Sequence, residues 1–120
     1  MIIAVTAQGR DLQAEVDPRF GRSRWFLLVD SSSMKFTVVE NRQSLALPQG
    51  AGIQAARTLA DHPVDVLLTG NCGPKAFTTL EAAGINVVVG VEGTIEAAVK
   101  DYLEGKLDHA LAANVEGHWV

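Results

Sequence analysis

The stretch VDVLLTGNCGPKAF, from Val64 to Phe77, decides the fold class of this chain. Its first six residues are mostly apolar, which predicts a buried strand. Proline is favoured at the first position of a helix, so we expect a helix to begin at Pro74 with Gly73 as its cap. Phe77 and Leu80 then lie on the buried face of that helix. Strands that are joined through helices should run parallel, so the stretch predicts an α/β sheet.

The residues on both sides of this stretch carry further signals for strands and helices. Two apolar runs joined by the short turn SSSM predict an antiparallel hairpin. Near the end of the chain, Thr94 can cap a helix and Gly105 can end it. The expected strands are 2–7, 25–30, 35–40, 64–69 and 85–91, and the expected helices are 53–62, 74–84 and 94–105. The order β-β-β-α-β-α-β-α is that of the ribonuclease H-like topology, an α/β fold with a mixed five-stranded sheet and helices packed on it.

This topology predicts where a ligand would bind. The first, third, fourth and fifth strands point the same way, because the second strand alone runs in the opposite direction. Their outgoing loops, 8–24, 41–52, 70–73 and 90–93, should therefore meet at one edge of the sheet. Ligands of open α/β sheets usually bind outside the carboxyl ends of the strands. All four loops carry glycine and two carry arginine, so this edge is the strongest functional signal that the residues provide.

Composition narrows the class of protein. The chain has 120 residues, of which 48% are hydrophobic, and we expect one domain over residues 1–120. Its net charge of −4 argues against general affinity for nucleic acid. No apolar run is long enough for a membrane span, and no secretory signal is visible, so we expect no membrane partner. With one cysteine the chain cannot form an internal disulfide, and a cytoplasmic location is expected.

The turn TGNCGPK has features of an anion site. If the helix begins at Pro74, backbone N–H groups near its start lack intrahelical partners. Gly70 and Gly73 let the backbone approach a ligand closely, and Lys75 adds positive charge. The spacing of a phosphate-binding P-loop is missing. The alternative is an ordinary strand-to-helix turn, which the glycines alone do not exclude.

Cys72, the single cysteine, has several candidate roles. A helix start is expected to lower its pKa. A nucleophile would need a nearby histidine, and nothing in the sequence brings His62, His109 or His118 to the loop edge. A zinc site would need further cysteine or histidine ligands. A single soft ligand to a metal–sulfur cluster and an inert turn residue both remain open.

The ribonuclease H-like topology also raises the question of a nuclease. Such enzymes hold two divalent ions with carboxylates on the first strand and near the fourth. The first strand, IIAVTA, has no carboxylate, and Asp65 lies at the start of the fourth strand, which is the wrong end. The sequence therefore argues against nuclease activity.

Several segments together resemble the dinitrogenase iron–molybdenum cofactor biosynthesis family. They are DPRFGRSRWFLLVD after the first strand, the glycine-rich helix entry GAGIQAARTLADH, and the Gly-x-x-Gly-Pro-x-Ala turn. The resemblance covers residues 2–107, and within the family the chain looks similar to the orange protein type. It implies a ribonuclease H-like carrier without catalytic activity, which binds, stores or transfers an anionic metal–sulfur cluster. The implied cluster is a molybdenum–copper sulfide cluster or an iron–molybdenum cofactor precursor.

A guest of this kind needs backbone donors, a few cations and shielding from water rather than a full set of protein ligands. The single cysteine departs from any multi-cysteine cluster site, which fits electrostatic capture of a preformed cluster. Cys72 is then the one candidate metal ligand, and the alternative function is a metal-free regulatory or scaffold module that binds a partner protein. The residues expected to hold the cluster are Arg19, Arg22, Gly70, Asn71, Cys72, Gly73 and Lys75.

Overall fold

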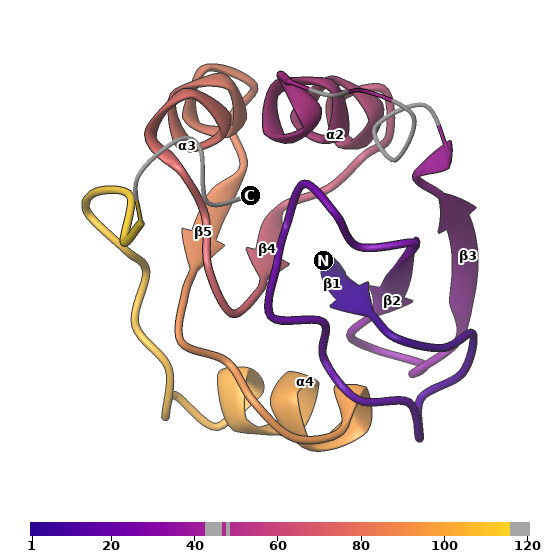
Figure 1. The fold of residues 1–120 in the computed structure, drawn as a ribbon. Helices are drawn as coiled ribbons and strands as arrows, with labels where there is room; N and C mark the ends of the chain where they lie inside the picture. Colours follow the sequence, from indigo (N-terminus) through magenta and orange to yellow (C-terminus); the bar gives the residue numbers. More distant parts are fainter. Residues whose placement is uncertain (43–46, 48, 116–120) are drawn as a thin grey trace.

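The computed structural model of the chain describes residues 1–42, 47 and 49–115 (Figure 1). Among the elements that the described residues define, five strands and the helices α2, α3 and α4 follow one another in the expected order. The strands are β1 (Ile2–Ala7), β2 (Trp25–Asp30), β3 (Phe36–Glu40), β4 (Val66–Leu68) and β5 (Asn86–Val88). The helices are α2 (Ala51–Ala60), α3 (Pro74–Ala82) and α4 (Ile95–Leu103).

The strands form one mixed sheet in the order β3-β2-β1-β4-β5. β2 pairs antiparallel with both β1 and β3, whereas β4 pairs parallel with β1 and β5. The predicted α/β fold with its mixed five-stranded sheet is confirmed. As expected, β1, β3, β4 and β5 point in one direction, which sends their outgoing loops to a single edge.

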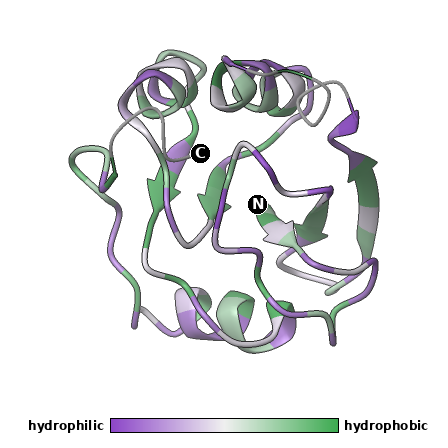
Figure 2. Cartoon of the chain, in the orientation of Figure 1, coloured by the Kyte–Doolittle hydropathy of each residue, from purple (hydrophilic) through white to green (hydrophobic). Residues whose placement is uncertain are grey.

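The sheet lies between two layers of helix. Figure 1 shows α2 and α3 together on one face and α4 on the other. Neighbouring residues of β1 alternate between the two faces. Ala4 belongs to the apolar cluster beneath α2 and α3, whereas Ile3 and Val5 belong to the cluster beneath α4. In Figure 2 the strands are coloured mostly as hydrophobic, in agreement with a sheet buried on both faces.

Element bounds differ from the sequence prediction mainly at the ends. The helix expected at 53–62, α2, begins at Ala51, because Gly50 adopts a left-handed conformation (φ 75°) that turns the chain into it. The fifth strand ends at Val88 rather than 91, because the chain turns at Gly90 (φ 75°). The loop predicted at 41–52 includes residues 43–46 and 48, which lie outside the described residues.

Helix termini follow the predicted capping signals. Gly73 is the N-cap of α3 and Pro74 is its first residue. The Thr94 hydroxyl accepts a hydrogen bond from the Ala97 N–H at 3.2 Å, which satisfies one free donor of α4. In the described part of the chain, no helix is both long and apolar enough to cross a membrane.

Candidate functional site

The first loop lies directly against the turn that follows β4. The Phe20 N–H donates to the Asn71 carbonyl at 3.3 Å, and the Asn71 side-chain Nδ2 donates to the Pro18 carbonyl at 2.9 Å. Arg19 and Asn71 thereby pair as an isolated parallel bridge. The first loop and the turn after β4 are therefore held side by side at the predicted edge, although Arg19 and Asn71 are 52 residues apart in sequence.

Glycines allow the close approach of these loops. A Cβ atom at Gly70 would lie 2.6 Å from the Pro18 Cα, and one at Gly21 would lie 2.7 Å from the Gly52 nitrogen. Both distances are shorter than real side chains tolerate. The first loop thus touches both the turn after β4 and the start of α2, which brings three of the four predicted loops together.

The fourth loop joins the same edge. The Gly90 N–H donates to the Gly70 carbonyl at 2.8 Å, and the Val16 N–H donates to the Gly93 carbonyl at 2.9 Å. The described parts of the four loops therefore gather at one edge of the sheet, as the topology predicted.

The N-terminus of α4 also lies at this edge, but its donors are already occupied. The Ile95 N–H donates to the Ala14 carbonyl at 2.9 Å, and the Glu96 N–H donates to the Leu12 carbonyl at 3.0 Å. Two carbonyls of the first loop thus replace the anion that a helix N-terminus can bind. This helix start does not favour an anionic guest.

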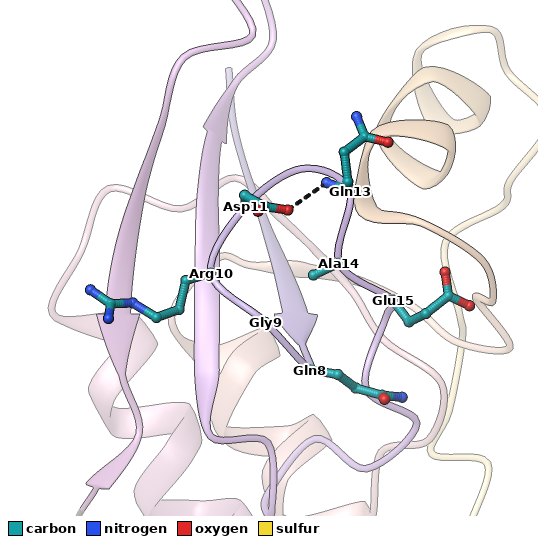
Figure 3. A pocket seen from close by; sticks show the side chains of 7 residues that line it. All are labelled: Gln8, Gly9, Arg10, Asp11, Gln13, Ala14 and Glu15. Carbon is teal, nitrogen blue, oxygen red and sulfur yellow. Dashed lines mark hydrogen bonds between the residues drawn. The ribbon is translucent and has the colours of Figure 1, made fainter.

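A shallow pocket beside α4 is formed by the first loop itself, residues 8–15 (Figure 3). Asp11 and Glu15 line it, and the Asp11 carboxylate accepts a hydrogen bond from the Gln13 N–H at 2.9 Å. The one cationic side chain in its lining, Arg10, points away from the other labelled side chains (Figure 3). With two carboxylates and one arginine in its lining, this pocket does not suit an anion.

The start of α3 differs from that of α4. The N–H groups of Gly73, Lys75 and Ala76 have no hydrogen-bond acceptor among the described residues. The first N–H of the helical pattern is that of Phe77, which donates to the Gly73 carbonyl at 2.9 Å. Backbone donors without acceptors at the positive end of a helix are suited to an anion.

Three predicted cations lie at or near this helix start. Lys75 is exposed in the first turn of α3, and Arg19 is exposed beside Asn71. In the described part of the chain neither side chain takes part in an ion pair. Arg22 is half-buried and its Nη1 donates to the Leu47 carbonyl at 2.8 Å, which ties the first loop to the segment before α2. Arg19 and Lys75 are therefore the two cations best placed to face a guest.

Cys72 has an environment that the sequence did not predict. Its side chain is 0% exposed, and its Sγ lies 3.7 Å from the Gly73 carbonyl. Burial raises the pKa of the Cys72 thiol from its ordinary value of 9.0 to about 12. The expectation that the helix start lowers this pKa is wrong, because loss of hydration outweighs the helix dipole here. The thiol is protonated at neutral pH and packs as part of the apolar core.

The raised pKa predicts a specific dependence of stability on pH. The unfolded chain ionises this thiol above pH 9, whereas the folded protein keeps its proton until about pH 12. Unfolding then releases a proton, so the free energy of unfolding should fall as pH rises through this window, by up to about 1.4 kcal/mol per pH unit. Urea unfolding of the parent and of Cys72→Ala at several pH values checks this. If the difference in unfolding free energy between the two proteins stays constant from pH 8 to 11, the raised pKa of Cys72 is contradicted.

Asn114 is a site residue that sequence reasoning missed. Its Oδ1 accepts a hydrogen bond from the Cys72 N–H at 2.8 Å, and its own N–H donates to the Cys72 carbonyl at 3.2 Å. Its Nδ2 donates to the Gly70 carbonyl at 3.2 Å and to the Asn71 Oδ1 at 3.0 Å. The sequence around Asn114 has no periodicity that predicts a contact. The one available signal was that backbone N–H groups of the turn 70–73 would need acceptors from elsewhere in the chain.

The histidines do not join the site as far as the structure describes them. His62 follows α2 at the opposite end of the sheet, and His109 pairs with Tyr102, with 2.7 Å between its Nε2 and the Tyr102 hydroxyl. His118 lies outside the described residues. Among the described residues, no group of three or more His, Cys, Asp or Glu side chains is placed to hold a metal ion. Asp65 accepts the Ile2 N–H at 2.8 Å, at the end of the sheet remote from the loops.

The chain is similar to several known proteins over most of its length. A family model described as dinitrogenase iron-molybdenum cofactor matches residues 1–105. The structure of the apo form of the orange protein from Desulfovibrio gigas is similar, with a TM-score of 0.93 and 47% identity over 95% of this chain and 96% of that one. An NMR structure of a Thermotoga protein proposed to be a NifB protein gives a TM-score of 0.81 and 34% identity, over 97% and 98% of the two chains. An uncharacterized protein of Methanocaldococcus jannaschii is 29% identical over 96 residues, which are 78% of this chain and 80% of that protein.

Proposed function

Because the chain belongs to the dinitrogenase iron–molybdenum cofactor family, we propose that it is a carrier for an anionic metal–sulfur cluster. It binds, stores or transfers the cluster and has no turnover of its own. In this proposal the cluster is cargo, delivered preformed to a cytoplasmic protein. The guest favoured by the likeness to orange protein is a molybdenum–copper sulfide cluster, with an iron–molybdenum cofactor precursor as the second candidate.

One observation carries the proposal. The first turn of α3 offers the N–H groups of Gly73, Lys75 and Ala76 without an acceptor among the described residues. The start of α4, at the same edge, is capped by carbonyls of the first loop. The described residues thus supply acceptors at the start of α4 and none at the start of α3, which lies beside two cations without ion pairs in the described structure. An anion bound there would gain charge-assisted hydrogen bonds and the favourable end of the helix dipole.

The donor set fits a sulfide cluster better than a single metal ion. Sulfide on a thiometallate carries negative charge and accepts hydrogen bonds, so backbone N–H groups and cations can hold it without covalent ligands. A bare metal ion would need several protein ligands, and the described residues provide no such group. In this proposal Arg19 and Lys75 face the cluster, Arg22 holds the first loop in position, and Gly70 lets that loop pack closely against the turn.

Direct ligation by Cys72 requires a further change in the protein. A thiol whose pKa is about 12 is protonated at neutral pH, whereas metals bind the thiolate. Capture by backbone donors and cations therefore comes first. Cys72 remains the one candidate metal ligand, and it can act only once its surroundings open.

The proposal is tested by reconstitution. Tetrathiomolybdate and copper are added to the apoprotein, and the mixture is passed through a desalting column before visible spectra and metal content are recorded. We expect a coloured species that stays with the protein at about one cluster per chain. The protein unfolded in urea serves as the control and should retain none. Loss of all colour and metal at stoichiometric loading would contradict the carrier proposal and favour the metal-free module that binds a protein partner.

A further inference from the structure

The chain that follows α4 forms an irregular strap, residues 106–114, which runs past β5 towards α3 (Figure 1). At its start, Lys106 pairs with Asp101 and Glu104, and Leu107 packs against the apolar cluster beneath α4. The rest of the strap is held at three points. Tyr102 and His109 contact each other through the hydroxyl and Nε2 at 2.7 Å, and the Ala110 N–H donates to the Val87 carbonyl at 2.6 Å. The third point is Asn114, which lies over the turn 70–73 and makes the four hydrogen bonds described above.

Asn114 occupies a donor that belongs to the candidate site. Cys72 comes directly before the open N–H group of Gly73, and its own N–H is the one donor of this turn that the strap fills. The acceptor is a neutral carboxamide oxygen at 2.8 Å. A sulfide anion would compete for the same N–H, because charge-assisted hydrogen bonds are stronger than neutral ones.

The strap also packs against the apolar core beside the turn. Ala110 and Ala113 are half-buried against the apolar cluster that contains this thiol. Other parts of the strap have little contact with the protein: Leu111 is 96% exposed, and Ala112 is exposed. Beyond Leu107 the segment is held by a few hydrogen bonds and two small apolar side chains, so this part opens at a free-energy cost well below that of global unfolding.

We propose that residues 106–114 are an autoinhibitory strap, in which Asn114 holds the turn 70–73 closed and leaves it when an anionic cluster binds. The inference rests on the proposed function, since the guest is the cluster of the same site. Strap release frees the Cys72 N–H and opens a path to its Sγ. In the closed form the Cys72 N–H is not available to the cluster. Part of the binding free energy is then used to displace the strap, so the apparent affinity is lower than that of the open form.

If the strap is autoinhibitory, the variant Asn114→Ala should differ from the parent in two measurable quantities. Alkylation of Cys72 by iodoacetamide in the apoprotein should become at least tenfold faster, because the turn opens more often. The dissociation constant of the copper–thiomolybdate cluster should fall about fivefold to tenfold, because less binding energy is used to displace the strap. The control is Leu111→Ala, which removes an exposed side chain of the same strap and should change neither quantity. Circular dichroism and urea unfolding establish that both variants stay folded.

The two readouts separate the strap from the carrier function. Faster alkylation together with tighter cluster binding supports the strap. If the parent binds the cluster and Asn114→Ala matches the parent in both measurements, the strap is wrong and the carrier stands. Weaker cluster binding by Asn114→Ala also overturns the strap, because Asn114 would then help to hold the guest. If the parent binds no cluster, the proposed function fails, and the strap fails with it as a regulator of cluster binding.

Discussion

Replacing Gly70 by alanine is expected to lower the free energy of unfolding by about 3 kcal/mol. The new Cβ would lie 2.6 Å from the Pro18 Cα and 2.8 Å from the Pro18 carbonyl oxygen. Both contacts are to backbone, so no side chain can rotate away and the first loop must shift. The same shift would separate Pro18 from Asn71, whose side chain donates to the Pro18 carbonyl at 2.9 Å. Urea unfolding gives the stability change, and amide shifts of residues 17–20 report on the loop.

Gly84→Ala is the matched control. Gly84 has a left-handed φ of 78°, but a Cβ there would have no neighbour within 4 Å. Its substitution should cost about 1–2 kcal/mol through backbone strain alone and leave residues 17–20 undisturbed. A Gly70→Ala protein as stable as Gly84→Ala, with an unchanged first loop, would contradict the packing of the loops described here.

Reversing the two cations at the open helix start should weaken cluster binding at least a hundredfold, or about 3 kcal/mol. In the variant Arg19→Glu/Lys75→Glu, two attractive charges become repulsive towards an anionic guest. Both side chains are exposed and neither has an ion pair in the described structure, so stability should change little. Visible titration with the copper–thiomolybdate cluster measures the loss.

A second double variant, Lys35→Glu/Arg57→Glu, controls for net charge. Lys35 is exposed in the turn between β2 and β3, and Arg57 is exposed in the last turn of α2, both at the opposite end of the sheet. This variant changes the net charge by the same amount and should bind the cluster within a few-fold of the parent. Equal losses in the two variants would mean that only overall charge matters, which excludes a defined site at α3.

The fold followed from local signals because each one has a local physical cause. Pro74 begins α3 and Thr94 caps α4, since both effects depend on a few adjacent backbone groups. The direction of β4 and β5 followed from the helices that join them to the preceding strands. The convergence of the loops at one edge then required only the order of the strands.

The candidate site was less predictable because it depends on contacts distant in sequence. The helix start alone predicts a lowered pKa for Cys72, but burial raises it, and Asn114 comes from a segment with no pattern. Arg19 and Arg22 look equivalent in sequence, yet Arg22 bonds the Leu47 carbonyl whereas Arg19 lies beside Asn71. Likewise, the starts of α3 and α4 differ because the first loop folds back onto α4 and because Thr94 caps α4, whereas Gly73 has no side chain to cap α3.

The most direct test of the carrier is an NMR titration of the ¹⁵N-labelled apoprotein with the copper–thiomolybdate cluster. We expect the largest amide shifts on Gly73, Lys75 and Ala76, with the Ile95 and Glu96 amides at the capped start of α4 almost unchanged. Shifts centred on residues 8–15, or equal shifts at both helix starts, would contradict it.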